Sequence, residues 1–493
     1  MVLIHRLSEG RSLYVSIALG FFAASIALLS TLPAKAAMLA PVVVLPFCWW
    51  VLLQSHRWLS VFLCALIALP PLPIRLGDSG PHPALIVLCL GLLSAAIHIR
   101  LWNRFAGRLG FLLCGFTAAL LLSVITAAVN SGADIAFGSF SRVILFAIAP
   151  FVFFFSLNTA RFNGTHAMGL LKWLFRAGVL AALFACVDFY FQFPTPAGFG
   201  PQFVWLDEGV FRRAQGLFYE ASTLGNFCAF FLVMVLVALR RRSSEAPVSR
   251  FELTLGAVVF ATALIFSYSR GSLLNLFSAA FALAILNRKF LGRSAVFFAG
   301  CAVLCPALVY FVFPAFAQSY LSRLSNSLAF IWSTPNGVLS GRVASWSQLT
   351  QFLVDEPWRV FFGIGYKTLP YSDLVGSTVI ADNTYLSLLI EVGIGGLLLL
   401  VLLNLEILKR GLQAFRSLSP QRSFFGEWIF CFWIGELVQM TSGDLITYWR
   451  LLPLYFWVLA MAVRSDEQAV GFEIEQSNLP GVGRYRELQR SSR

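Results

Sequence analysis

Residues 339–397 read LSGRVASWSQLTQFLVDEPWRVFFGIGYKTLPYSDLVGSTVIADNTYLSLLIEVGIGGL and form the longest polar interval in an otherwise apolar sequence. Apolar residues recur at spacings of three and four over residues 341–355, which predicts a helix with one apolar face. A glycine-rich turn follows at 362–366, and Asp382 and Asn383 stand before the next apolar run as natural N-cap residues. Polar residues held between apolar segments need a reason, and chemistry at a membrane surface is one.

The composition is that of an integral membrane protein. Of the 493 residues, 58% are hydrophobic and only 12% are charged, and the mean hydropathy is +0.79. We therefore predict an all-α polytopic membrane protein with about 14 helices that cross a bilayer of roughly 30 Å. The predicted spans are 12–32, 36–54, 58–72, 83–99, 108–130, 140–157, 168–193, 217–239, 251–268, 272–287, 294–313, 383–404, 424–441 and 447–464.

The distribution of Lys and Arg predicts how these spans are oriented. Four basic clusters fall on one side when the spans alternate: Arg240-Arg241-Arg242, Arg288-Lys289, Lys409-Arg410 and Arg464. The positive-inside rule makes that side cytoplasmic, so both termini are expected in the cytoplasm. Topology thus explains the net charge of +13, and no nucleic-acid partner is expected.

This topology divides the chain into five parts. Residues 1–193 are N-terminal membrane helices, and residues 194–313 are membrane helices that carry the motifs around Arg213, Glu220 and Arg270. The remaining parts are a large external loop at 314–382, C-terminal membrane helices at 383–464 and a polar tail at 465–493, expected to be disordered and cytoplasmic. No inverted internal repeat, which marks many transporters, is visible.

Arginines on the external side are the main clue to function, because topology depletes positive charge there. Seven remain: Arg212, Arg213, Arg270, Arg323, Arg342, Arg359 and Arg450. Arg270 stands out because it lies in a very tight turn between two predicted spans. The guanidinium fork suits phosphate oxygens, so arginines converging from separate loops would hold a diphosphate without a metal ion. Each arginine taken alone is equally consistent with an anchor at the lipid headgroups.

The sequence does not indicate a metal site. The external segments carry no DxD motif, no HxxxH motif and no Cys/His cluster. A histidine base in the large loop is also missing, because His82 is the one histidine expected outside. The candidate general bases are acidic: Asp382, Glu220, Asp207, Glu208, Asp355 and Asp373.

Two of these carboxylates lie at predicted helix N-termini. The helix dipole at Asp382 and Glu220 would lower the pKa of a carboxyl group, although simple helix capping explains both positions equally well. Glu391 lies deeper in a predicted span, where an ionisable residue is a functional candidate by default. Asp188, near the outer end of another span, is either a site residue or a helix-packing carboxylate.

Several motifs, taken in order, resemble those of the O-antigen ligase/polymerase superfamily, which includes Wzy-type polysaccharide polymerases and lipopolysaccharide core ligases. They are RAQGLFYEAS at 213–222, SRG at 269–271, SGR at 340–342, FGIGY at 362–366, DNTYL at 382–386 and EVGIGG at 391–396. Their order on either side of one large external loop, over about residues 212–400, carries the resemblance.

The resemblance implies a metal-independent glycosyltransferase without cofactors, built into a helical bundle of the bacterial inner membrane. Its donor would be an oligosaccharide on undecaprenyl diphosphate at the periplasmic face. Ligases of this superfamily typically carry a histidine where this chain has Asp382, so the departure favours a polymerase of O-antigen, capsule or exopolysaccharide. A ligase that transfers the glycan to lipid A-core or to a protein hydroxyl is the alternative, followed by a transporter of lipid-linked oligosaccharides. A chain-length regulator and a flippase are the implied protein partners, beside inner-membrane lipid.

The resemblance also implies roles for individual residues. Arg270 and Arg342, with Arg213, would neutralise the donor diphosphate as the sugar–phosphate bond breaks. Asp382, or else Glu220, would orient or deprotonate the acceptor hydroxyl. Helix 341–355 would help to shape the sugar site. Further substrate-binding candidates are Arg212, Tyr366, Asn383 and Glu391.

Overall fold

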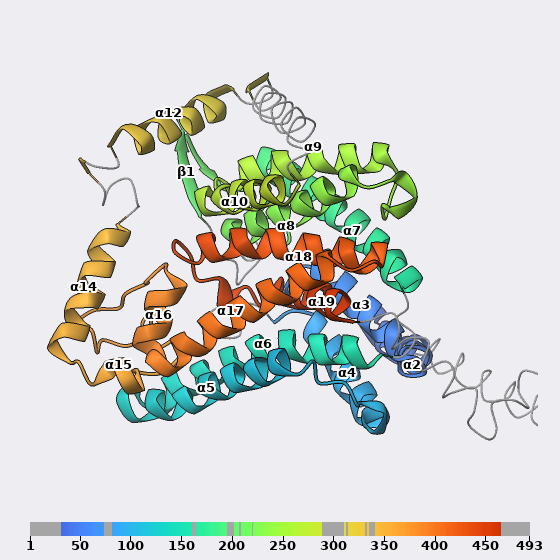
Figure 1. Cartoon of the computed structure of the whole chain (residues 1–493), viewed down its shortest axis with the longest axis horizontal. Coiled ribbons are helices and arrows are strands. Elements are labelled where there is room, and N and C mark those ends of the chain that lie inside the picture. The colour runs from blue at the N-terminus through green and yellow to red at the C-terminus, as the bar shows by residue number, and fades with distance from the viewer. Residues whose placement is uncertain are drawn as a thin grey trace, which may run out of the picture.

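The computed structural model of the chain describes residues 31–72, 81–159, 164–194, 202–206, 209–218, 220–287, 310–311, 314–330, 333–334 and 341–464. These residues are almost entirely helical, with one two-stranded hairpin (Figure 1). Most of the predicted spans 12–32 and 294–313, the tail at 465–493 and the candidate bases Asp207 and Glu208 lie outside the described residues.

The described helices and strands form three groups along the chain. The first group is α2 (Leu32–Leu52), α3 (Ser55–Ala68), α4 (Ala84–His98), α5 (Arg108–Ser131), α6 (Ala133–Asn158) and α7 (Gly164–Phe191). After β1 (Phe203–Leu206) and β2 (Gly209–Arg212), which pair antiparallel, come α8 (Ala221–Arg240), α9 (Arg250–Phe266) and α10 (Arg270–Leu286). The last group is α12 (Pro314–Phe330), α14 (Arg342–Asp355), α15 (Arg359–Phe362), α16 (Thr384–Glu391), α17 (Ile394–Phe415), α18 (Pro420–Gln439) and α19 (Leu452–Val463). The described residues also form three 3-10 helices, η1 (Ile99–Leu101), η2 (Ser243–Glu245) and η4 (Leu445–Thr447).

Four of the described helices, α5 to α8, are long and apolar enough to cross a membrane, and the bent pair α2–α3 would make a fifth span. Helices α4, α10 and α19 are apolar but shorter. Helices suit a bilayer because they satisfy every backbone hydrogen bond internally. The prediction of an all-helical, polytopic membrane protein therefore agrees with the structure, whereas these residues do not establish the predicted count of about 14.

Helix α8 is the centre of the bundle. It is buried along most of its length and packs against α9, α10 and α18. On α5 the side chains of Phe111, Leu122 and Val129 are exposed on the face turned away from the bundle. Apolar residues in that position are what a helix needs against lipid.

The single span predicted at 383–404 is wrong, because the structure breaks it into α16 and α17 at Gly393. Gly393 has a φ of +87°, and a Cβ placed there would lie 2.4 Å from the carbonyl oxygen of Phe361 at the end of α15. Only glycine fits such a close backbone approach in this conformation. The helix then resumes at Ile394 and continues to Phe415, well beyond the predicted end.

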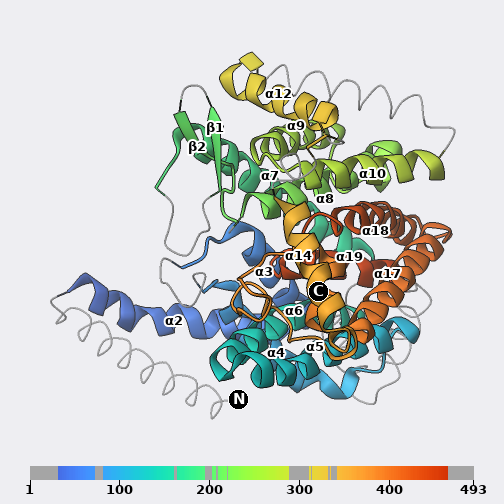
Figure 2. The same ribbon diagram turned by 90° about the vertical axis from the view of Figure 1, so that its left-hand side faces the viewer.

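The predicted external loop at 314–382 is folded where the structure describes it. Helix α14 confirms the helix predicted at 341–355. The loop has a small apolar core of its own, to which α16 contributes Ile390: Leu349, Phe352, Ile364, Leu369, Val375, Val379, Ala381 and Ile390. Figure 1 shows α14, α15 and α16 gathered at one end of the bundle, and Figure 2 views that end directly, with α14 in front.

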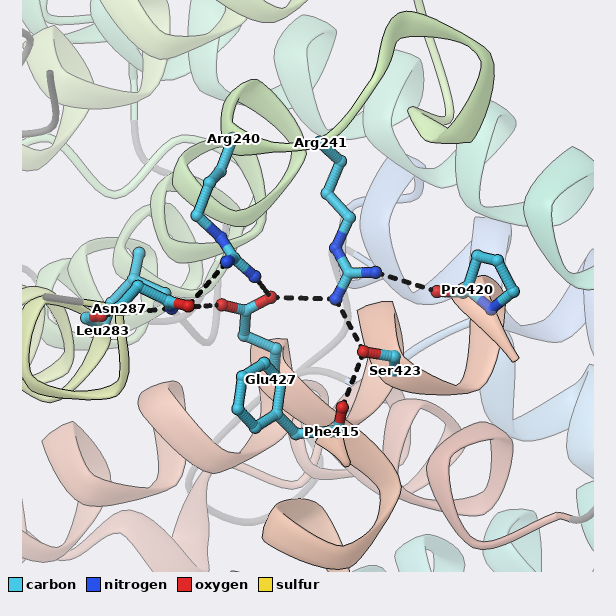
Figure 3. Close-up of polar contacts among 8 residues, drawn as sticks. All are labelled: Arg240, Arg241, Leu283, Asn287, Phe415, Pro420, Ser423 and Glu427. Atoms are coloured by element: carbon cyan, nitrogen blue, oxygen red, sulfur yellow. Dashed lines mark hydrogen bonds and ion pairs between the residues drawn. The ribbon is translucent and has the colours of Figure 1, made fainter. Parts of the chain in front are cut away.

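A cluster of charged residues links α8 and α18 at the end of α8 that carries Arg240 and Arg241 (Figure 3). The carboxylate of Glu427 is fully buried and pairs with both Arg240 and Arg241; the nearest nitrogen of Arg241 lies 2.9 Å from it. Asn287, just past α10, donates a hydrogen bond to the other oxygen of Glu427 at 2.8 Å. Three helices are thus held together at this end by one carboxylate whose burial is compensated by two cations and an amide.

Candidate functional site

The N-termini of α8 and α10 meet at the end of the bundle that carries α14. Ser269 is the N-cap residue of α10, and its side chain accepts a hydrogen bond from the backbone N–H of Ser272. The hydroxyl of Ser272 in turn donates to the backbone carbonyl of Ser222, in the first turn of α8, at 3.4 Å. The two helices therefore direct their free N–H groups toward the same region.

The segment that follows α18 joins a third helix N-terminus to these two. Thr384, the first residue of α16, donates its backbone N–H to Met440 at 2.9 Å and its hydroxyl to Gly443 at 2.7 Å. On the other side of the same segment, Ser442 lies so close to Gly271 of α10 that a Cβ there would be 3.3 Å from its hydroxyl oxygen. Three helix N-termini therefore converge; α16 contributes its dipole alone, because its first N–H groups are bonded to Met440 and Asn383.

A layer of neutral and acidic side chains lies beneath this convergence and ties the three bundle helices together. Asn226 of α8 donates to Glu436 and Gln439 of α18 at 2.5 and 2.9 Å, and Asn275 of α10 donates to the same two oxygens at 3.0 and 3.1 Å. The sequence reasoning missed this layer. Its signal was a set of amide and carboxylate residues inside predicted spans, where a polar side chain needs a partner.

Arg342 and Asp382 form an ion pair at the mouth of the site. Arg342 is the first residue of α14, and its Nε lies 3.1 Å from Oδ2 of Asp382. Both side chains keep contact with solvent, at 26% and 42% of full exposure. Asn383, rather than Asp382, caps α16, because its Oδ1 accepts from the backbone N–H groups of Tyr385 and Leu386. The structure therefore brings one candidate cation and one candidate base together.

A second ion pair, between Lys367 and Asp444, was not predicted. Lys367 follows the FGIGY turn, and Asp444 follows α18, so the pair joins the folded loop to the segment beside α16. Burial lowers the pKa of Lys367, and the carboxylates of Glu391 and Asp382 act against that shift. The sequence did hold a signal, because a lysine in the loop predicted to be external is an exception to the positive-inside rule, as the arginines are.

Glu220 is placed at the mouth of α8 but does not behave as expected. Its side chain makes no capping bond to the helix; instead it accepts a hydrogen bond from the hydroxyl of Ser222 at 3.0 Å. Protein packed around the carboxyl group raises the pKa of Glu220 although its outer edge is exposed, and the nearby Asp382 raises it further. The expectation that the helix dipole lowers this pKa is therefore wrong, because desolvation is the larger effect.

Tyr448 is linked to Glu220 and Ser222. Its hydroxyl shares a hydrogen bond with Ser222, and burial, followed by the negative charge of Glu220, raises the pKa of the phenol. Tyr448 therefore stays protonated, so that Glu220, Ser222 and Tyr448 form a connected set of one carboxyl group and two hydroxyls. Sequence reasoning missed Tyr448, which lies in the short segment before α19.

Arg213 and Arg270 come from neighbouring segments. The Nε of Arg213 donates to the backbone carbonyl of Ser267 at 2.8 Å, which fixes Arg213 beside the turn that leads into α10. Arg213 also lies close enough to Glu220 to stabilise its ionised form. Arg270 is the first residue of α10 and half-buried. Both predicted cations thus lie where the helix N-termini converge.

Three other external arginines have structural partners. Arg212 is buried and pairs with Asp188 of α7 at 2.6 Å, so the predicted substrate contact of Arg212 is replaced by an internal ion pair. Arg359 is buried and contacts Glu356 at 2.7 Å. Arg450 is buried and donates to backbone carbonyls, among them that of Leu69 at 3.1 Å. The alternative expected for single arginines was an anchor at the lipid headgroups; in the structure these three instead contact other segments of the protein.

Tyr366 and Glu391 lie behind the site rather than on its surface. Both are buried, and the backbone N–H of Tyr366 donates to the hydroxyl of Ser123 on α5 at 3.2 Å. The carboxylate of Glu391 accepts from the hydroxyl of Ser387 at 3.0 Å and from the backbone N–H of Leu369 at 3.3 Å. Tyr366 and Glu391 therefore support the turn that carries Lys367. Direct contact with substrate had been expected for both residues.

The backbone is unusual at three points around the site. Tyr268, Lys367 and Asp382 have φ values of +55°, +57° and +44°. These values lie in the left-handed region, which residues other than glycine rarely adopt. Each stands directly beside or within one of the charged groups described above. Left-handed backbone conformations at non-glycine residues cost free energy and persist only where the surrounding structure holds them. They are found most often at functional sites.

The arrangement suits an anion better than a metal ion. Among the described residues, no group of three or more His, Cys, Asp or Glu side chains could hold a metal. Four cationic residues, Arg213, Arg270, Arg342 and Lys367, instead lie on the segments that surround these helix N-termini. Charge-assisted hydrogen bonds from such groups bind phosphate oxygens strongly.

Comparison with known families finds a match to part of the chain. Residues 255–401 match the O-antigen ligase family Wzy_C, which confirms over that stretch the resemblance noted in the sequence. Members of this family are membrane glycosyltransferases of the bacterial envelope that act on lipid-linked glycans. The matched stretch runs from α9 into α17 and includes Arg270, Arg342, Lys367 and Asp382, whereas Glu220 precedes it. A search of curated proteins found no match.

Proposed function

We propose that this chain, with its O-antigen ligase domain at residues 255–401, polymerises repeat units carried on undecaprenyl diphosphate at the periplasmic face of the inner membrane. The observation that supports the proposal is the position of three arginines: Arg270 begins α10, Arg213 is hydrogen-bonded to Ser267 just before α10, and Arg342 pairs with Asp382 just before α16. A diphosphate is the part of a lipid-linked glycan that such a site would recognise.

In the proposed reaction the arginines act on the leaving group. The bond between the anomeric carbon and the diphosphate oxygen breaks, and the electron pair stays on that oxygen. Arg270 and Arg342, with Arg213, stabilise the charge that develops there, as fixed donors do in a site that needs no reorganisation. The polyprenyl diphosphate is already activated, so no separate energy source is required.

The acceptor is a hydroxyl group of another lipid-linked repeat unit, which attacks the anomeric carbon. We assign its deprotonation to Asp382, because the contact with Arg342 places this carboxylate beside the group that would hold the diphosphate. Glu220 is the second candidate, since it lies within electrostatic range of Asp382. A positioned general base contributes roughly a hundredfold to ten-thousandfold in rate.

The acceptor separates a polymerase from a ligase of the same family. A histidine precedes the asparagine of the last motif in typical ligases of the superfamily, whereas Asp382 precedes Asn383 here. This difference supports polymerisation. Transfer to lipid A-core or to a protein hydroxyl is the alternative, because the chemistry at the donor would be identical.

The test is reconstitution of the purified protein in liposomes with single repeat units on undecaprenyl diphosphate as the sole glycan. The proposal predicts a ladder of products that differ by one repeat unit. A ligase would leave the repeat unit unextended until lipid A-core or an acceptor protein is added. The matched control is Arg176→Lys, which changes a partly exposed arginine whose partner is Glu252, away from the site, and should give a normal ladder.

A further inference from the structure

We propose that Lys367 is a further donor-binding residue, and that Asp444 is a resident counter-ion which the donor diphosphate displaces from it. This inference rests on the proposed function, because it concerns the same site. It adds a cation that is not an arginine and a carboxylate whose role is to hold that cation until the donor arrives.

The first observation is that the side chain of Lys367 is held in one direction. Its backbone has a φ of +57°, its side chain is only 8% exposed, and its Nζ pairs with Asp444. The ammonium group also lies 5.5 Å from the ring centre of Tyr366. The backbone carbonyl of Lys367 accepts a hydrogen bond from Arg142 at 3.5 Å. Lys367 is therefore held both at its backbone carbonyl and at its ammonium group, and it is not a mobile surface residue.

The second observation is that the pair faces the candidate site. Asp444 follows Gly443, which accepts a hydrogen bond from Thr384 at the start of α16, and Asp444 keeps 20% of its side chain exposed. Lys367 also lies within electrostatic range of Asp382, the partner of Arg342. The ammonium of Lys367 and the guanidinium of Arg342 therefore belong to one charged region.

The third observation is that two of the site's cations are each occupied by a carboxylate. Arg342 holds Asp382, and Lys367 holds Asp444. A phosphate oxygen that replaces a carboxylate exchanges one charge-assisted hydrogen bond for another, so the buried ammonium never loses its partner. Lysine suits this exchange because its ammonium is a compact charge that needs no planar partner.

The competing explanation is that the pair is a strut between the external loop and the segment after α18. Both explanations predict damage when Lys367 alone is removed, so that variant is uninformative. They differ for Asp444→Asn, which removes the competing anion but retains a side chain of the same size. They differ also for the double variant Lys367→Met/Asp444→Asn, which removes both charges and leaves the net charge of the protein unchanged.

The experiment measures binding of undecaprenyl diphosphate and of inorganic pyrophosphate to purified protein in nanodiscs. For the double variant we expect both probes to bind roughly tenfold more weakly, because one charge-assisted contact to the diphosphate is lost. For Asp444→Asn we expect binding about threefold tighter or more, because the diphosphate no longer displaces an anion. The charge-balanced control Arg176→Gln/Glu252→Gln removes a partly exposed ion pair elsewhere and should bind like the wild type.

Each remaining outcome is decisive. Binding of undecaprenyl diphosphate by the double variant within twofold of wild type would overturn the inference and leave the proposed function standing. Loss of pyrophosphate binding alone would overturn it too, since Lys367 would then hold a free anion rather than the donor. Should the double variant fail to fold, weaker binding by Asp444→Asn would support the strut and reject the counter-ion. A wild type that binds no undecaprenyl diphosphate would reject the proposed function itself.

Discussion

Asp382→Asn separates catalysis from stability more cleanly than any other single change at the site. The amide has the shape of the carboxylate, and asparagine tolerates the φ of +44° at this position as well as aspartate does. The ion pair with Arg342 is partly exposed on both sides, so its loss should change the free energy of unfolding by less than about 1 kcal/mol. Alanine would be a poorer choice, because it would add roughly 1 kcal/mol of backbone strain.

The expected effect on the reaction is much larger. An amide cannot accept the proton of the acceptor hydroxyl, so the contribution of the general base is lost. That contribution is roughly a hundredfold to ten-thousandfold, or about 3–5 kcal/mol in the activation free energy. We therefore expect Asp382→Asn to slow glycosidic bond formation at least about a hundredfold while its melting temperature stays close to that of the wild type.

The assay is single-turnover bond formation with donor already bound, so that donor affinity does not enter the rate. Melting is followed in parallel by the fluorescence of the 13 tryptophans. Glu356→Gln is the matched control, because this carboxylate belongs to the same external loop but pairs with Arg359 outside the site, and its rate should be normal. A rate for Asp382→Asn within threefold of wild type would refute the assignment; a large loss in Glu220→Gln instead would transfer the role to Glu220.

Three further predictions concern Arg270, the ion pairs of Glu427 and the orientation of the chain in the membrane. Arg270→Lys keeps the charge but loses the fork, so the rate should fall roughly a hundredfold while single repeat units accumulate on lipid; near-normal chain length would show that Arg270 does not grip the diphosphate. Glu427→Gln leaves Arg240 and Arg241 without their shared counter-ion and should lower the free energy of unfolding by roughly 3 kcal/mol or more, and unchanged melting would contradict the importance of this cluster. A reporter fused at Ser333 should be active in the periplasm, because residues 314–382 are predicted to lie between cytoplasmic basic clusters; activity restricted to the cytoplasm would invert the topology.

The parts of the fold that could be predicted are those that follow from local composition. An apolar run long enough for a bilayer forms a helix because no other local structure satisfies its backbone, as at α5 and α8. The break between α16 and α17 could not be predicted in this way. It depends on the approach of Phe361 to Gly393, which is a tertiary contact between residues 32 positions apart in the sequence.

The site shows the same division. The resemblance proposed Arg342 and Asp382 as residues of one site, and the structure pairs them although they are 40 residues apart. Arg212 and Arg213 look equivalent in the sequence, yet one pairs internally with Asp188 and the other reaches the turn before α10. Arg212 is the last residue of β2 and Arg213 lies just beyond it, and that short strand had no sequence signal of its own. Asp444 was missed because its position depends on how the segment after α18 packs on α16.

The stoichiometry of the reaction in metal-free buffer tests the central claim most directly. Purified protein in liposomes, supplied with single repeat units on undecaprenyl diphosphate and excess EDTA, should release one undecaprenyl diphosphate for each glycosidic bond formed. Arg270, Arg342 and the three helix N-termini would supply the stabilisation that a metal ion supplies elsewhere. Turnover that stops in EDTA and returns with a divalent cation, or bonds formed without release of undecaprenyl diphosphate, would contradict it.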